Sequence, residues 1–469
     1  MGDTPASLQA DFTRHREAFR RQPYPGAATR RAWLDQLAQL VRDHRSEWQD
    51  AIAADFGGRS RHETQLLEIF PSLEAIRHAR RHVARWMRPE GRSTSLWFLP
   101  GRSYVLPQPL GVAGIVVPWN YPLYLAIGPV VPALAAGNRV MVKMSETTPA
   151  TGALLARLAA RHFPGGELTV ANGGPDLAGA FCALPFDHLL FTGSTAIGRK
   201  VLRTTAETLT PATLELGGKS PAIVGRGFPV AEAASRILFG KCLNAGQTCI
   251  APDYALVPAE SVDAFIAAAR RTVAALYPTL AANPDYTAIV DERHRERLAR
   301  CLADALAKGA RATEINPAGE SLAGTGKMAP TILTRVDDLM EVMREEIFGP
   351  LLPLLPYRDL DEAIAYVNAR PRPLALYLFE HDGGAVDRVL RETVSGGVSV
   401  NETLLHVAQD DLPFGGVGPS GMGRYHGREG FDTFSQRKSV FRQSRLNGLK
   451  LFRAPYGKRF ESLVRFLLR

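Results

Sequence analysis

The spacing of apolar residues predicts helices over the first part of the chain, from residue 1 to about residue 90. The run 31–41, Arg-Ala-Trp-Leu-Asp-Gln-Leu-Ala-Gln-Leu-Val, repeats apolar residues at three- and four-residue steps with polar residues between them. This is the period of a helix with one apolar face. From Trp97 to Pro118 the pattern changes to short β-rich runs interrupted by proline and glycine. These runs predict a hairpin followed by a buried strand.

Beyond residue 118 the predicted strands and helices alternate. Strands are predicted at 139–143, 168–170, 188–191 and 220–224, and helices at 151–162 and 197–209. Such alternation predicts a parallel sheet with right-handed crossovers. A second α/β region is expected from about residue 231 to residue 401.

The most apolar stretch, residues 110–142, is expected to be buried in a soluble protein as strand, loop and helix. It contains four prolines, which argue against a single membrane-spanning helix. With 45% hydrophobic and 22% charged residues, the chain of 469 residues can bury a large core, and its length suggests two or three domains. The N-terminus has no apolar signal-peptide core, and the four cysteines show neither a CxxC pair nor metal-ligand spacing. We therefore expect a cytoplasmic protein without a metal site.

The formal charge of +9 is confined to the end of the chain. Lys and Arg outnumber Asp and Glu by 56 to 47, but residues 437–469 alone hold ten basic residues and one acidic residue, Glu461. The net formal charge of residues 1–436 is therefore zero. A nucleic-acid-binding protein needs a spread basic face, and the neutral body does not supply one.

One cysteine lies in a setting that suits a nucleophile. Cys249 follows Asn244-Ala-Gly246, where a helical pattern ends, and its neighbours are small and polar. A free cysteine is most often an inert core residue, and Cys182, Cys242 and Cys301 fit that interpretation. The position of Cys249 on irregular backbone favours a reactive thiol.

Two polar residues in apolar surroundings are further candidates. Glu215, flanked by leucines and followed by paired glycines, is either a solvent-facing strand residue or a partly buried base with a raised pKa. Asn120, between Pro118 and Pro122, is either a satisfied core group or a preorganised donor. The spacing alone leaves both alternatives open.

A strand that runs into Gly193-Ser194 and a following helix forms a turn that could bind an anion. The spacing is GxxxxG and not the dinucleotide pattern GxGxxG, so an ordinary tight turn explains it equally well. An apparent phosphate loop at residues 217–220 lacks its first glycine, because position 213 is threonine.

Together these residues resemble the aldehyde dehydrogenase superfamily over about residues 20–445. The motifs that carry the resemblance occur in the family's order: Pro118-Trp-Asn, Lys143-Met-Ser-Glu146, Phe191-Thr-Gly-Ser, Leu214-Glu-Leu-Gly-Gly-Lys, Gly246-Gln-Thr-Cys249, Glu345-Glu-Ile-Phe-Gly-Pro350 and Pro413-Phe-Gly-Gly416. The runs 249–254, 401–412 and 421–427 are similar to the class 3 and coniferyl aldehyde dehydrogenase branch. Met144 replaces the family's usual proline, and the tail beyond Arg445 is outside the general pattern.

The resemblance implies a mechanism. Cys249 would attack the aldehyde and form a thiohemiacetal, and Asn120 with the Cys249 backbone N–H would stabilise the oxyanion. After hydride transfer, Glu215 would activate water to hydrolyse the thioester. Relatives that transfer the acyl group to coenzyme A generally lack this glutamate, so its presence favours the hydrolytic reaction.

The resemblance also implies an NAD site. In the family, Lys143 and Glu146 would bind the adenosine ribose, and a carboxylate there disfavours the 2′-phosphate of NADP. NAD is therefore expected, and NADP could also be accepted. The residues expected to bind the cofactor are Trp119, Lys143, Glu146, Gly193, Ser194, Gly198, Leu216, Glu346 and Phe348.

The expected fold is α/β and like that of aldehyde dehydrogenases. A Rossmann-like NAD domain would comprise residues 1–92 and 110–217, a catalytic α/β domain 218–420, and a small β bridging element 93–109 and 430–445. In the family this element completes the partner's sheet, so we expect a homodimer. The basic amphipathic tail, 446–469, could contact an anionic membrane, but packing across the dimer is the preferred interpretation.

The substrate is expected to be an aromatic aldehyde similar to coniferyl aldehyde, with medium-chain aliphatic aldehydes as the alternative. His406 could contact the distal end of the aldehyde, although a structural role is the preferred interpretation. A different class of function would be a nucleotide-independent cysteine hydrolase or acyltransferase, which would pair Cys249 with His406 or His426.

Overall fold

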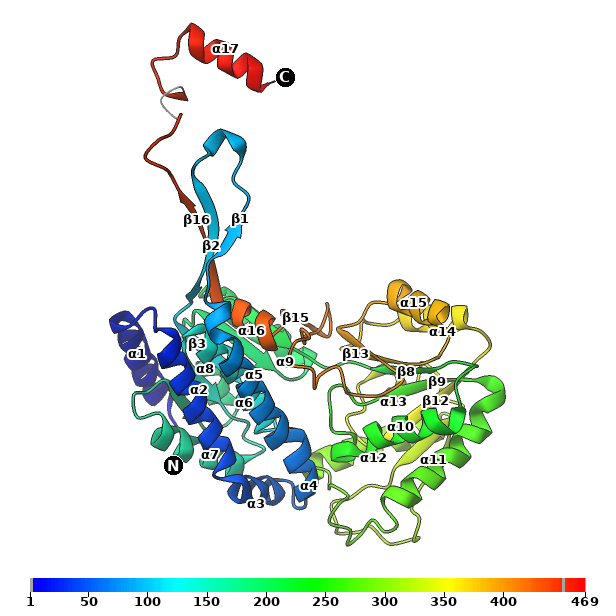
Figure 1. Cartoon of the computed structure of the whole chain (residues 1–469). Helices are drawn as coiled ribbons and strands as arrows, with labels where there is room; N and C mark the ends of the chain where they lie inside the picture. The colour runs from blue at the N-terminus through cyan, green and yellow to red at the C-terminus, as the bar shows by residue number, and fades with distance from the viewer. Residues whose placement is uncertain (1–2, 449–451, 469) are drawn as a thin grey trace.

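The structure is a computed structural model that describes residues 3–448 and 452–468. The strands of this part of the chain form three sheets, with six, seven and three members. The two larger sheets lie side by side in two helix-covered halves, and the three-stranded sheet forms an arm that projects from the first half (Figure 1). Residues 216–220 carry the chain directly from one large sheet to the other.

Helices fill the N-terminal segment, as the apolar spacing predicts. They are α1 (Pro5–Arg21), α2 (Ala27–Arg42), α3 (Arg45–Asp55), α4 (Arg61–Thr64) and α5 (Phe70–Trp86), with a π-helical turn, η1, at Gln65–Ile69. A capping box starts α1, in which Thr4 and Ser7 each accept the other's backbone N–H. The apolar faces of α2 and α5 pack against each other and against α6 (Tyr124–Ala136).

The six-stranded sheet has the order β15-β7-β6-β3-β4-β5. Its strands are β3 (Val112–Val116), β4 (Arg139–Lys143), β5 (Leu168–Ala171), β6 (His188–Thr192), β7 (Ala212–Glu215) and β15 (Gly421–Met422). All pairs are parallel except β15 with β7. The helices α7 (Pro149–His162), α8 (Pro175–Cys182) and α9 (Thr195–Ala206) connect or follow these strands. The predicted parallel alternation is confirmed here, although α9 begins two residues before the predicted helix and ends three residues before its predicted end.

The apolar stretch 110–142 forms β3, a loop, α6 and most of β4, which confirms its interpretation as buried strand, loop and helix. Pro129 and Pro132 lie inside α6, where nearly every side chain is buried. Arg30 donates to the carbonyls of Ala135 and Ala136 and so satisfies the C-terminal end of this buried helix. Among the described residues, no helix combines the length and apolar character needed to cross a membrane.

The seven-stranded sheet has the order β10-β11-β12-β9-β8-β13-β14 and is parallel except for β10. Its strands are β8 (Pro221–Val224), β9 (Tyr254–Pro258), β10 (Arg311–Glu314), β11 (Thr331–Thr334), β12 (Leu351–Tyr357), β13 (Ala375–Phe379) and β14 (Gly397–Val400). The α-helices of this half are α10 (Val230–Cys242), α11 (Val262–Leu276), α12 (Glu292–Ala307), α13 (Glu341–Arg344), α14 (Leu360–Asn368) and α15 (Gly383–Glu392). A 3-10 turn, η3 (Leu243–Gly246), follows α10, and another, η4 (Ala259–Ser261), precedes α11. The expected second α/β region is thereby confirmed.

The arm consists of β1 (Glu90–Arg92), β2 (Arg102–Pro109) and β16 (Ser435–Arg442), and α16 (Gly427–Thr433) lies at its base. Strand β2 pairs antiparallel with both neighbours. The hairpin therefore begins before residue 97, where the sequence analysis placed it, and Trp97 lies in a 3-10 turn, η2 (Leu96–Phe98). Because β1 is polar and largely exposed, its sequence carries no alternating apolar signal.

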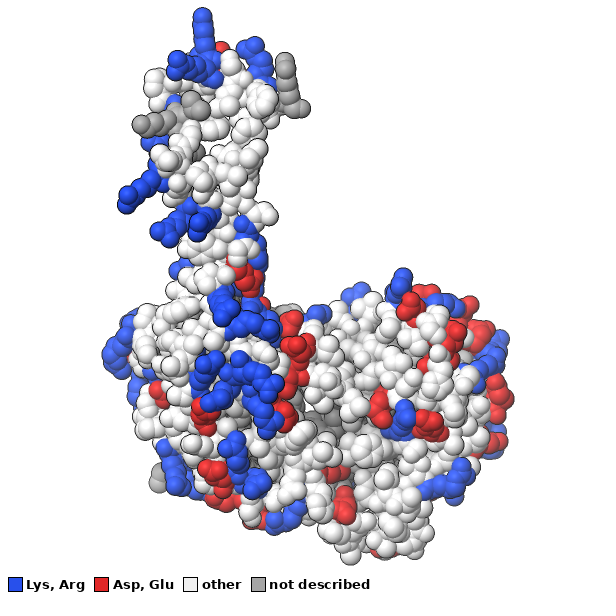
Figure 2. Space-filling view, viewed as in Figure 1, with Lys and Arg blue, Asp and Glu red and all other residues white. Residues whose placement is uncertain are grey.

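The tail contains one helix, α17 (Lys458–Leu467), in agreement with the helical spacing seen in the sequence. No residue of α17 is buried, and the ring of Phe466 contacts Trp97 at the tip of the arm, with 6.1 Å between centroids. The charged side chains visible on the upper projection, which includes the tail, are nearly all Lys and Arg, whereas both signs of charge are mixed over the body (Figure 2). The tail residues 449–451 and 469 are outside the described chain.

Candidate active site

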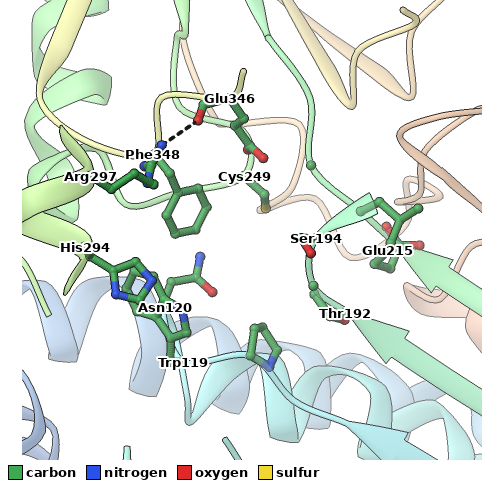
Figure 3. Close-up of a pocket in the computed structure, with 14 residues that line it drawn as sticks. Trp119, Asn120, Thr192, Ser194, Glu215, Cys249, His294, Arg297, Glu346 and Phe348 are labelled. Atoms are coloured by element: carbon green, nitrogen blue, oxygen red, sulfur yellow. Dashed lines mark hydrogen bonds between the residues drawn. The ribbon is translucent and has the colours of Figure 1, made fainter. Parts of the chain in front are cut away.

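A cavity with a volume of about 230 Å³ lies between the two large sheets. Residues from both halves of the molecule surround it (Figure 3). Its lining consists of Pro118, Trp119, Asn120, Thr192, Gly193, Ser194, Glu215, Leu216, Gly217, Cys249, His294, Arg297, Glu346 and Phe348. All three predicted catalytic residues and six of the nine predicted cofactor residues therefore line one cavity.

The candidate nucleophile follows a strained turn. Asn244 and Ala245 have φ values of 51° and 50°, and Gly246 follows with 76°. A side chain at Gly246 would collide with the carbonyl of Gly349, so glycine is required there. Cys249 follows this turn, lines the cavity and is partly exposed. Its placement on irregular backbone is confirmed.

Burial raises the pKa of the Cys249 thiol to about 12, and the nearby carboxylates of Glu346 and Glu215 act in the same direction. Backbone N–H groups of Cys249 and Ile250 oppose this shift. The thiol is therefore protonated at neutral pH in this state of the site. Cys182, Cys242 and Cys301 are buried, in agreement with a packing role.

Glu215 occupies the last position of β7 and is 2% exposed. Both carboxylate oxygens are buried and lack a hydrogen-bond partner in the described part of the chain. Burial raises the pKa of Glu215 well above its ordinary value, and the charge of Arg424 only partly opposes it. An unpaired buried carboxylate costs stability. Glu215 is therefore not a solvent-facing strand residue but a buried acid with a raised pKa, and its role as a base stays a prediction.

Asn120 is 2% exposed and lies in the loop between β3 and α6. Its Nδ2 donates to the carbonyl of Gln247, at 3.2 Å, in the same turn that carries Cys249. A primary amide has two N–H groups, so this bond leaves a second donor available. The side chain is therefore held beside the thiol segment with a free N–H.

The turn after β6 forms one wall of the cavity. Ser194 caps α9, and its Oγ accepts the N–H of Ile197 at 3.4 Å. The N-terminus of α9 thus lies at the cavity, where its free N–H groups and the helix dipole favour binding of an anion. Gly198 does not line the cavity, but a side chain there would collide with Leu216. Its role in the structure is to let α9 approach Leu216.

Glu346 and Phe348 lie in the loop after α13. Burial and the charge of Asp253 raise the pKa of Glu346 to about 8. Its Oε1 is buried without a hydrogen-bond partner among the described residues. The ring of Phe348 meets Trp119 edge-on, with 5.3 Å between centroids. A carboxylate with one free oxygen beside aromatic rings fits a ligand that offers hydroxyl groups and a flat ring.

Two residues of the cavity that the sequence analysis did not find, His294 and Arg297, come from α12. His294 packs edge-on against Trp119, with 4.7 Å between centroids, and Arg297 donates to the backbone carbonyl of Glu346 at 3.3 Å. Pro118, Thr192 and Gly217 belong to predicted motifs but were not assigned to the site. No motif includes α12, and charged residues on a surface helix carry no functional signal of their own.

Lys143 and Glu146 do not line this cavity. Lys143 ends β4, is 1% exposed and donates from Nζ to the carbonyl of Met144 at 2.6 Å, whereas Glu146 is exposed. Strand β4 pairs in parallel with β3, so Lys143 and Glu146 lie at the carboxyl ends of the strands, as Asn120 does. An extended ligand along this edge could reach them.

The residues present fit a dinucleotide. A helix N-terminus accommodates a pyrophosphate, the free Oε1 of Glu346 can accept a ribose hydroxyl, and Trp119 and Phe348 provide aromatic surfaces. Beside them lie a thiol, a buried unpaired carboxylate and a fixed amide. This combination of groups is typical of an oxidoreductase site that contains a reactive thiol.

Comparisons with known proteins identify the family. The model of the aldehyde dehydrogenase family matches residues 4–440. A probable coniferyl aldehyde dehydrogenase of Pseudomonas aeruginosa is 54% identical, over 97% of this chain and 95% of its own length. The coniferyl aldehyde dehydrogenase of Pseudomonas sp. strain HR199 is 50% identical, over 98% and 96% respectively. The chain therefore belongs to the aldehyde dehydrogenase family, which confirms the resemblance.

Solved structures agree with this assignment. Staphylococcus aureus AldH in a substrate-bound state superposes with a TM-score of 0.92 at 37% identity, covering 98% of this chain and 99% of that one. A Mycobacterium tuberculosis aldehyde dehydrogenase complexed with NAD⁺ gives 0.85 at 31% identity, over 94% and 90%. The expected aldehyde dehydrogenase-like fold is confirmed, and the protein is an aldehyde dehydrogenase.

Proposed function

We propose that this enzyme oxidises an aromatic aldehyde to its carboxylic acid with NAD, through a covalent thioester on Cys249. The observation that carries the proposal is the presence of Cys249, Glu215 and Asn120 in one cavity with a dinucleotide-type wall. Formation of NADH, followed at 340 nm with coniferyl aldehyde and NAD, tests it. Absence of NADH formation with every aldehyde offered would contradict it.

The first step is addition of the thiol to the aldehyde. Cys249 releases its proton to solvent, and Sγ bonds to the carbonyl carbon as the carbonyl oxygen takes the negative charge. The free N–H of Asn120 and the backbone N–H of Cys249 stabilise that oxyanion. Removal of one such donor typically costs about 10²–10³ in rate.

NAD, when bound, would supply the acceptor for the hydride of the former carbonyl carbon. Gly193 and Ser194 would hold its pyrophosphate, and Glu346 would accept hydroxyls of the nicotinamide ribose. Trp119, Leu216 and Phe348 would contact the cofactor through apolar surface. These roles use the helix N-terminus and the free carboxylate oxygen described above.

Glu215 completes the reaction as a general base. It would remove a proton from a water molecule, which attacks the thioester and releases the carboxylic acid and the Cys249 thiol. Burial raises the pKa of Glu215 above its ordinary value, and a higher pKa makes the ionised carboxylate a stronger base toward water.

For the adenosine end of the cofactor, we propose binding to Lys143 and Glu146. A carboxylate beside the ribose repels a 2′-phosphate, which favours NAD over NADP. Glu146 is exposed and sits at the sheet edge shared with the cavity. NADP could still be accepted at a lower rate.

The preference for an aromatic aldehyde rests on the two Pseudomonas relatives named for coniferyl aldehyde, which are 50% or more identical to this chain. The alternative is a general dehydrogenase of medium-chain aliphatic aldehydes. A panel of coniferyl aldehyde, benzaldehyde, hexanal and acetaldehyde distinguishes the two. A higher kcat/KM for hexanal than for both aromatic aldehydes would favour the alternative.

A cysteine hydrolase without nucleotide is less consistent with the geometry. Of the described histidines, His294 alone lines the cavity, on the side of Trp119. Burial lowers the pKa of His406 to about 4 and that of His426 to about 3, so both are neutral and only weakly basic near neutral pH, and neither lines the cavity. His406 bonds Ser399 at 2.9 Å, which supports a structural role.

We further propose a cytoplasmic homodimer with the division into NAD domain, catalytic domain and bridging element given above. The arm has a free edge at β16 and the seven-stranded sheet has one at β14, so a partner's arm could extend that sheet. The exposed apolar residues of α17 would then also pack on the partner. Light scattering tests the dimer.

A further inference from the structure

A buried arginine contacts the segment that carries Asn120. Arg59 lies between α3 and α4, and none of its side chain is exposed. Its Nη1 donates to the backbone carbonyl of Asn120 at 2.8 Å. Its guanidinium also lies over the rings of Phe56 and Tyr121, at 4.9 and 4.8 Å from their centroids. One side chain thus fixes the backbone of Asn120 and the ring of the next residue.

The charge of Arg59 is balanced by Glu68, which is equally buried and lies 3.4 Å away. The Oε2 atom of Glu68 accepts the backbone N–H groups of Leu123 at 2.7 Å and of Tyr124 at 3.1 Å. The ion pair therefore holds the chain at both ends of the short loop from Asn120 to the start of α6. The rest of the loop is restrained by Pro122, which has no rotation about φ.

Other bonds connect this loop to the thiol segment. Asn244 donates to the same Asn120 carbonyl at 3.0 Å, and the hydroxyl of Tyr121 lies 2.7 Å from Thr248 Oγ1. Thr248 immediately precedes Cys249. The position of Asn120 relative to the thiol is thus set by contacts on its backbone and not only by its side chain.

A fully buried ion pair is an expensive way to stabilise a fold, because neutral residues of similar shape are often as stable. In Arg59, Nε and Nη2 are buried without hydrogen-bond partners in the described chain, which adds to that cost. The pair is therefore poorly explained by stability alone. Apart from the stacking of Arg59 on Phe56, the contacts described for the pair are with the loop that presents Asn120.

We propose that Arg59 is a positioning residue for the oxyanion site, which holds the Asn120 backbone so that its side-chain amide meets the developing charge. This inference rests on the proposed role of Asn120 in the reaction. Arg59 itself touches neither the cavity nor the reacting atoms.

The test uses a neutral replacement of the pair, Arg59→Met with Glu68→Gln, which removes both charges of the ion pair together. We expect kcat to fall by about 10²-fold, as small misplacements of catalytic groups do. KM for NAD and the rate of Cys249 alkylation by iodoacetamide should stay near their wild-type values, because the cofactor wall and the thiol are intact. The matched control is Arg61→Met, which removes an exposed arginine from the neighbouring α4.

A double-mutant cycle with Asn120→Ala distinguishes positioning from general damage. If Arg59 acts through the amide, the Arg59/Glu68 replacement should lower kcat by no more than about twofold once that amide is gone. The same large loss in both backgrounds would overturn the inference. Full kcat in Asn120→Ala alone would instead contradict the proposed function of Asn120.

If the paired replacement does not fold, Arg59→Lys carries the same cycle, because it keeps the charge opposite Glu68. Lysine lacks the planar fork that bonds the carbonyl while lying flat over two rings. A loss of kcat that disappears in the Asn120→Ala background supports the inference, and unchanged kcat overturns it.

Discussion

Gly217 leaves open the space that the carboxylate of Glu346 occupies. A β-carbon at residue 217 would overlap Oε2 of Glu346 and lie 2.6 Å from its Cδ. Gly217 belongs to the connection between the two large sheets, whereas Glu346 lies in the loop after α13. The absence of a side chain at one position therefore fixes where the other presents its free oxygen to the cavity.

This relationship predicts the effect of Gly217→Ala. The added methyl group should displace Glu346, and overpacking of this kind costs about 1–3 kcal/mol. We expect kcat/KM for NAD to fall by about tenfold or more. The control is Gly179→Ala in α8, where a β-carbon has nothing within 4 Å. Equal kcat/KM in the two variants would show that Glu346 does not need this space.

Asn120→Ala removes the proposed oxyanion donor. We expect kcat to fall by about 10²–10³-fold, because a preorganised donor acts mainly on the transition state. The rate at which iodoacetamide alkylates Cys249 should change little, since that reaction forms no oxyanion. Asn368→Ala, in an exposed position of α14, serves as the control. A small effect on kcat would exclude Asn120 from the oxyanion site.

Glu215→Gln should separate the two halves of the reaction. Acylation continues, so a rapid burst of about one NADH per active site is expected. Steady-state turnover should fall by about 10²–10⁴-fold, the usual contribution of a general base. In the wild type, steady turnover should rise with pH as Glu215 loses its proton, because burial raises its pKa. The variant should lack this rise.

Stopped-flow absorbance at 340 nm measures both phases, and Glu314→Gln, on the exposed edge strand β10, is the matched control. Cys249→Ser should abolish the burst as well as the steady rate. A Glu215→Gln enzyme with normal steady turnover would require another base.

Much of the fold could be predicted because buried parallel strands carry a strong apolar signal. Strands β4 and β6 are buried over nearly their whole length and stand out in the sequence. The first strand of the arm could not be predicted, because Glu90–Arg92 is exposed and lies outside any core. Strand pairing at the arm depends on β16, more than 300 residues away in the sequence.

The residues discussed for the site likewise include some that could be predicted from the sequence and some that could not. Cys249 and Glu215 could be proposed from their local surroundings, namely a turn after a helix and an acid among leucines. Arg59 and His294 could not, since their importance depends on contacts between segments far apart in sequence. An arginine after a glycine pair and a histidine on a charged helix are both typical of an exposed surface. Only tertiary packing brings His294 to the cavity and Arg59 to the loop that carries Asn120.

The raised pKa of the Cys249 thiol leads to a further prediction for the enzyme without substrate. Because burial raises the pKa of Cys249 to about 12, the thiolate is a small fraction of the total at neutral pH. Well below its pKa, that fraction grows about tenfold for each pH unit. Alkylation of Cys249 by iodoacetamide, followed by mass spectrometry, should therefore accelerate about tenfold per unit between pH 7 and pH 9.

Glu346→Gln removes a nearby negative charge and should speed alkylation, most clearly above pH 8, where Glu346 is ionised. Cys249→Ala identifies any background labelling of the three buried cysteines. A rate that levels off below pH 8 would mean that the thiol already has a low pKa in the free enzyme.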